Sequence, residues 1–167
     1  QGGMYLVMEV NTAKLLEKLA KDPDAQFKVI LKASDSVSTL SNENVVSILA
    51  RKMKEKNIRM SRYFGSIRED DGVITSKLLQ QEADAVTRAI EIISNRVNQY
   101  GVSEPSIQKQ GSRRIVIELP GIAREEEAKR LLQGSALLEF KLVKDANFAI
   151  PIIFGGILLI DLLIKVL

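Results

Sequence analysis

Three basic residues around a predicted hairpin turn are the best candidates for a binding site. Lys109, Arg113 and Arg114 flank Gly111-Ser112, a Gly-X pair that is typical of a two-residue β-hairpin loop. Their ammonium and guanidinium groups would hold a phosphate or an acidic peptide through charge-assisted hydrogen bonds. Charged hairpin tips also keep proteins soluble, so a purely structural role is the competing interpretation.

Other reactive groups are scarce, because the chain contains no Cys and no His. This composition excludes thiol catalysis, disulfides, Cys/His zinc sites and Ser-His-Asp triads. The acidic run at 69–71 lacks the alternating oxygen ligands of a calcium loop. A second run, 125–127, falls in the first turn of a predicted helix, where carboxylates complement the helix dipole. No phosphate loop or nucleophile elbow occurs. We therefore expect no enzyme, no cofactor and no metal site.

One further polar pair, Asn95 and Arg96, lies late in a predicted long helix. We expect Arg96 to bridge to Glu104 or Glu118 and so to lock the end of that helix to the sheet. This role is structural rather than catalytic.

The composition is that of a globular protein, with 46% hydrophobic and 27% charged residues among 167. A net charge of +3 is too weakly basic to argue for nucleic acid by itself. The chain starts with Gln1, without an initiator Met or a signal peptide, so we expect a fragment of a longer protein.

Elements that would position the candidate residues follow from hydrophobic periodicity. Strands are predicted over 4–10, after Pro105, over 113–119 and over 136–143, and a short helix over 125–133. A long helix begins near Thr75 and ends at Gly101, where a left-handed cap favours glycine. Its apolar stripe is expected at Leu79, Ala83, Val86, Ile90, Ile93, Val97 and Tyr100.

Without the helical stretch after the first strand, the order is β-α-β-β-α-β, so the predicted fold class is α+β and ferredoxin-like. The predicted base comprises residues 1–10 and 75–144. Residues 11–74 form a helical insertion, in which the polar, Ser-rich segment 35–44 is expected to be a connection.

The apolar C-terminal segment, 145–167, has an uncertain role. Its last 19 residues are just long enough to span a bilayer as a helix. A buried strand-turn-strand is an equal competitor, and we favour a segment covered by protein rather than by lipid.

A family resemblance rests on IEIISNRVNQYGVSEPSIQKQGSRRIVIELPG, on AKRLLQGSALLEFKLV and on the opening QGGMYLVMEV. These stretches closely resemble the first periplasmic (P1) domain of SecD or SecDF, of the bacterial Sec protein-export machinery. The resemblance implies a location at the periplasmic face of the inner membrane and attachment through transmembrane helices outside this fragment. It also implies SecYEG, SecF and unfolded preprotein as partners, with coupling to the proton-motive force elsewhere in the full protein.

Two other functions stay open on the residues alone. The first is a basic ferredoxin-like module that binds nucleic acid, although the predicted strand 113–119 offers Ile and Val where base stacking requires aromatic residues. For that reason nucleic acid is not among the expected partners. The second is a regulatory domain that binds a small ligand between helices and sheet.

Overall fold

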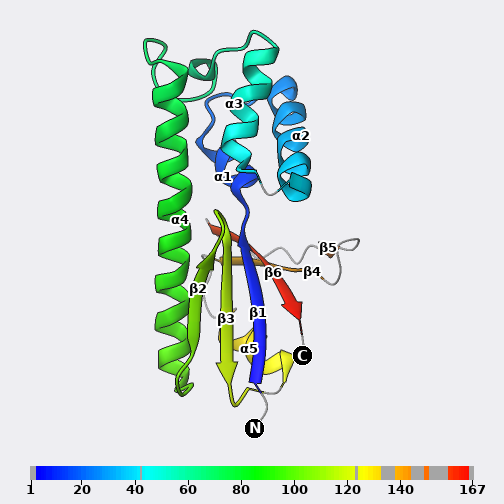
Figure 1. Cartoon of the computed structure of the whole chain (residues 1–167), viewed down its shortest axis with the longest axis vertical. Coiled ribbons are helices and arrows are strands. Elements are labelled where there is room, and N and C mark those ends of the chain that lie inside the picture. Colours follow the sequence, from blue (N-terminus) through cyan, green and yellow to red (C-terminus); the bar gives the residue numbers. More distant parts are fainter. Residues whose placement is uncertain are drawn as a thin grey trace. The chain divides into compact units, whose positions relative to one another are not determined.

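Two units make up the structure, a computed structural model that describes residues 3–41, 43–122, 124–132, 138–143, 149–150 and 158–165. Unit 1 is formed by Gln1–Asn11 and Asp84–Leu167, and unit 2 by Thr12–Ala83. Helix α4 (Asp71–Tyr100) begins in unit 2 and ends in unit 1 (Figure 1). The predicted long helix is therefore confirmed, but it starts about one turn earlier than its sequence pattern suggested.

Unit 1 contains a mixed sheet with the strand order β2-β3-β1-β6-β4-β5. All neighbours are antiparallel except β4 and β6, which are parallel. The strands are β1 (Gly3–Val10), β2 (Ser106–Gln110), β3 (Arg114–Pro120), β4 (Leu138–Val143), β5 (Ala149–Ile150) and β6 (Leu158–Lys165).

The core of unit 1 uses one face of this sheet. Leu6 of β1 stands opposite Ile117 of β3, and Met8 stands opposite Ile115; all four are fully buried. Because side chains alternate along a strand, the intervening residues lie on the other face. Helix α5 (Glu125–Leu132) lies behind the strands in Figure 1. The helices add buried apolar residues, namely Ala128, Leu131 and Leu132 from α5 and Ala89, Ile93 and Val97 from α4.

The α+β class is confirmed, whereas the ferredoxin-like arrangement is not. That arrangement would place the predicted strand 136–143 beside β1. The strand exists as β4, but β6 separates it from β1. The described part of the apolar tail, Ala149–Ile150 and Leu158–Lys165, is extended, and residues 151–157 lie outside the described residues. Among the helices of the described residues, none has the length and apolarity that a membrane span requires.

Two glycines occupy positions that require a left-handed backbone. Gly101 ends α4 with φ of 77°, and its N–H donates to the carbonyl of Asn98, which confirms the predicted cap. Gly111 has φ of 65° at the β2–β3 hairpin. Because Gln110 pairs with Arg114, the loop contains three residues, so the prediction of a two-residue turn was wrong.

Unit 2 is helical, with α1 (Thr12–Leu19), α2 (Ala25–Ser41), α3 (Val45–Glu55) and the short 3-10 helix η1 (Met60–Arg62). Three aromatic rings lie in its core. The ring centroid of Phe27 lies 4.7 Å from that of Tyr63 and 5.7 Å from that of Phe64. All three side chains are buried among aliphatic residues of α1, α3 and α4.

The Ser-rich segment predicted to be a connection is helical up to Ser41. Serine and threonine hydroxyls along it donate to the carbonyl four residues earlier, as Ser36 does to Lys32 and Thr39 does to Asp35. No Gly or Pro interrupts the segment. The hydroxyls therefore bond within the helix instead of competing with it.

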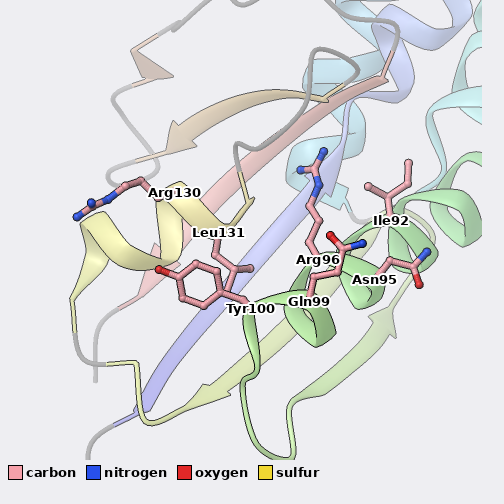
Figure 2. Close-up of a pocket in the computed structure, with 7 residues that line it drawn as sticks. All are labelled: Ile92, Asn95, Arg96, Gln99, Tyr100, Arg130 and Leu131. Carbon is pink, nitrogen blue, oxygen red and sulfur yellow. The ribbon is translucent and has the colours of Figure 1, made fainter.

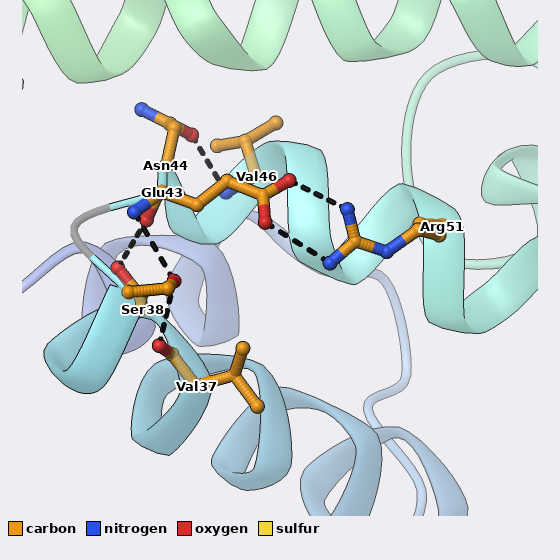
Figure 3. Close-up of polar contacts among 7 residues, drawn as sticks. Val37, Ser38, Glu43, Asn44, Val46 and Arg51 are labelled. Atoms are coloured by element: carbon orange, nitrogen blue, oxygen red, sulfur yellow. Dashed lines mark hydrogen bonds and ion pairs between the residues drawn. The ribbon is translucent and has the colours of Figure 1, made fainter.

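Helix α3 begins at a side-chain cap shown in Figure 3. The Oδ1 atom of Asn44 accepts from the N–H of Val46 at 2.8 Å, and the Ser38 hydroxyl of α2 donates to the Glu43 carbonyl at 2.6 Å. Glu43 also accepts two hydrogen bonds from Arg51, and these lower its pKa. These contacts fix the turn between α2 and α3.

A buried carboxylate connects α4 to the first residue of α1 and to the residue that caps α3. Glu82 of α4 is only 3% exposed, and it accepts from the hydroxyl of Thr12 at 2.6 Å and from the side-chain amide of Asn44. Thr12 begins α1, and Asn44 caps α3. One carboxylate thus joins the starts of two helices to α4.

We expect Glu82→Ala to lower the free energy of unfolding by about 2–3 kcal/mol, because it leaves the buried Thr12 hydroxyl and the half-buried Asn44 amide without their acceptor. Urea denaturation followed by circular dichroism measures this change. Glu91→Ala, at an exposed position of the same helix, is the matched control and should change stability by less than about 0.5 kcal/mol. Equal effects of both substitutions would show that the connection contributes nothing.

Asp24 gives unit 2 a stability that depends on pH. The N–H of Phe27 is the main cause that lowers the pKa of this carboxyl, and the Tyr63 hydroxyl and Arg62 act in the same direction. A depressed folded pKa adds stability above the unfolded value of about 3.9, and this stability is lost as the pH falls through the folded pKa. Asp24→Asn should therefore be less stable than the unmodified chain at pH 7, and the difference should shrink in acid below about pH 4. A difference that stays constant in thermal melts from pH 7 to acid would contradict this assignment.

Candidate functional site: the α4–α5 pocket and the basic hairpin

The three predicted basic residues do not share one face of the sheet. Lys109 lies in β2 and stands opposite the buried Ile115. Arg114 stands opposite Gln110 of β2 and Glu9 of β1, one position further along the ladder. Since neighbouring positions of a strand face opposite sides, Lys109 and Arg114 lie on opposite faces.

Glu9 is paired with two of the three basic residues at the hairpin. Its carboxylate forms ion pairs with Arg113 and with Arg114, the second at 3.6 Å between Nε and Oε2. The Arg113 side chain is only 11% exposed. Lys109 is exposed, so it is the most accessible of the three basic groups.

A pocket of about 430 Å³ opens between the last turns of α4 and the C-terminal part of α5 (Figure 2). This volume lies in the range of small-ligand pockets. Its wall combines apolar surface with two guanidinium groups, two amides and a phenol, and it contains no carboxylate among the described residues. The lining residues are Ile92, Asn95, Arg96, Gln99, Tyr100, Arg130 and Leu131.

Arg96 joins the two helices that form the pocket. Its guanidinium donates to the backbone carbonyl of Leu132, at the end of α5, rather than locking the helix end to the sheet through Glu104 or Glu118. Burial lowers the pKa of this guanidinium below its usual range. The residue therefore fixes the pocket wall and carries a partly desolvated positive charge into it.

Asn95 and Gln99 lie one helical turn apart on α4 and are exposed. Among the described residues, neither side-chain amide has a hydrogen-bond partner, although each can donate and accept. The sequence singled out Asn95 and Arg96, but it gave no sign of the α5 side of the pocket. Only the spacing of Ile92, Asn95, Arg96 and Gln99 on one helix face could have indicated a shared surface.

This arrangement suits binding, since its groups supply hydrogen bonds, positive charge and some apolar surface. Within the described residues, no group of three or more Asp or Glu side chains is placed to hold a metal ion. The carboxylates of Asp24, Glu43 and Glu82 accept hydrogen bonds from Arg, Tyr, Thr and Asn side chains and, at Asp24, from a backbone N–H.

Comparisons with known proteins place the chain in a family. Residues 86–145 match the model described as "Protein translocase subunit SecDF, P1 domain, N-terminal". Protein translocase subunit SecD of Rhodothermus marinus is 42% identical over 87% of the chain, and that of Escherichia coli (strain K12) is 35% identical over 86%. A third SecD, from Endomicrobium trichonymphae, is 56% identical over 40% of the chain. No solved structure matches it.

The fold is α+β, and these sequence matches are to subunits of a protein translocase. The chain belongs to the SecD/SecDF family and carries that family's P1 domain. It spans 25% of the length of the Rhodothermus relative and 26% of the length of the Escherichia relative.

Because Arg113 is paired with Glu9 and Lys109 is exposed, we expect Arg113 to contribute more to stability than Lys109. Arg113→Ala should lower the free energy of unfolding by about 1–2 kcal/mol, because it removes a largely buried partner of Glu9. Lys109→Ala removes the same charge from an exposed position and should cost less than about 0.5 kcal/mol. Urea denaturation of both variants is the measurement, and similar losses would mean that Arg113 does not stabilise the hairpin.

Proposed function

We propose that this chain is part of the periplasmic domain of a Sec translocase accessory subunit, which assists preprotein export through the SecYEG channel. In this proposal the domain contacts the emerging polypeptide or transmits that contact. SecF is the partner subunit, and coupling to the proton-motive force resides in membrane-spanning parts outside this chain.

The similarity to curated SecD proteins over 86% and 87% of the chain carries the proposal. The match to the P1 model begins at residue 86, so it covers the second half of α4, the hairpin and α5 and includes both walls of the pocket. The binding groups in that pocket agree with a domain that contacts another molecule rather than one that transforms it.

We further propose that unit 1 is a ferredoxin-like base in which β6 takes the place of the fourth strand. The order β2-β3-β1-β6 supports this assignment, because a ferredoxin-like sheet has its last strand antiparallel to the first. Unit 2 is then a helical insertion between the first strand and the long helix.

Site-specific crosslinking tests the contact with preprotein. The chain has no Cys, so single cysteines can be introduced at exposed positions such as Leu40, Lys109 and Gln99 in a full-length subunit freed of other cysteines. Each would carry a photoreactive maleimide while a preprotein is arrested in the SecYEG channel. We expect adducts with the preprotein from at least one position.

A translocating preprotein that yields no adduct from any exposed position of either unit would overturn the proposal of direct contact. The same probes in the absence of translocation are the control, since adducts formed there would reflect random collision.

A further inference from the structure

We propose that the α4–α5 pocket binds an extended polypeptide segment and selects segments that carry a carboxylate. This inference rests on the proposed contact with unfolded polypeptide and assigns to it a site and a chemical preference. Neither follows from the family match.

The amide spacing on α4 fits an extended chain. Asn95 and Gln99 are four residues apart, a rise of about 6 Å along the helix. Residues i and i+2 of an extended peptide are separated by roughly 6.7 Å and present their backbone groups to the same side. Each amide offers one acceptor and two donors, so the pair can bond to two successive peptide groups on one edge of the chain.

Charge in the pocket favours an acidic residue in that segment. Within the part of the chain that the structure describes, the wall contains Arg96 and Arg130 and no carboxylate. Arg130 is exposed, and its Nε donates only at 3.4 Å to the carbonyl of Glu126, while its two Nη atoms have no hydrogen-bond or ion-pair partner among the described residues. These two nitrogens form the fork that binds a carboxylate with two parallel hydrogen bonds.

Apolar surface completes the site without depending on a particular sequence. The Tyr100 ring is 51% exposed at the end of α4, and Figure 2 shows it turned toward Leu131 of α5. Ile92 adds a half-buried side chain at the other end of the amide pair. A large exposed ring beside hydrogen-bonding groups is a common composition of surfaces that bind proteins. The pocket therefore recognises backbone and charge more than side-chain shape.

Fluorescence anisotropy with labelled nonapeptides tests the proposal on the 167-residue chain. One peptide carries a single central Glu and its partner carries Gln, in an otherwise uncharged sequence with blocked ends. At about 150 mM salt, which limits long-range attraction, Arg130→Ala should weaken binding of the Glu peptide about tenfold. It should change binding of the Gln peptide little, and Gln99→Ala should weaken both peptides by a similar factor.

Lys109→Ala is the matched control, because it removes one exposed positive charge from the same unit outside the pocket. It should bind both peptides as the unmodified chain does, and Arg130→Lys should recover only part of the affinity for Glu. Circular dichroism establishes that each variant is folded. Equal losses in Arg130→Ala and Lys109→Ala would overturn the inference, since they would indicate attraction to overall charge. An equal affinity of the unmodified chain for the two peptides would overturn it as well.

The crosslinking positions separate this inference from the proposed function. Adducts from Leu40 or Lys109 with none from Gln99 would leave the contact with preprotein intact and remove the pocket as its site. A phosphodiester oligomer that displaces the Glu peptide at equal concentration would instead indicate a general anion site, and the preference for polypeptide would then be wrong.

Discussion

The antiparallel register between β1 and β3 is the constraint on which unit 1 depends. Seven residue pairs, from Gly3↔Pro120 to Glu9↔Arg114, set which side chains enter the core. A shift by one residue would turn over the strand that slips and bring either Glu9 or Arg114 into the apolar interior. The ion pairs of Glu9 therefore stabilise the register as well as the hairpin. The positive charges of Arg113 and Arg114 are paired with Glu9 and are therefore less available to a binding partner.

Strand β6 of the apolar tail pairs with β1 along the edge opposite to β3. By register, Asp161 stands opposite Glu9 and Lys165 stands opposite Tyr5. Periodicity in the sequence did not separate a strand from a membrane helix, because two charges four residues apart in an otherwise apolar run fit either structure. The pairing partner could not be predicted in this way. Whether β6 or β4 lies beside β1 is decided by tertiary packing between segments distant in sequence.

The long helix shows a different limit of sequence reasoning. Its existence and its Gly101 end were predicted from local signals, but the expected stripe ended at Tyr100, which is exposed. The buried line instead passes through Leu78 and Glu82. A charged residue is ordinarily placed outside the apolar face. Glu82 is buried because Thr12 and Asn44 donate to it, and these partners lie 70 and 38 residues away in sequence.

Predicting the candidate site failed for a related reason. With the predicted two-residue loop, Lys109 would stand opposite Arg114 on one face of the sheet. The three-residue loop of the structure shifts the register by one position and places the two residues on opposite faces. The pairing with Glu9 and the approach of α5 to α4 depend on contacts far apart in sequence. Two groups of arginines result, which the sequence alone does not distinguish. At the hairpin, Arg113 and Arg114 share a carboxylate of the protein, whereas the described residues of the pocket wall around Arg130 include none. A positive charge that folding has already neutralised offers little to a partner, so recognition of an acidic segment belongs to the pocket.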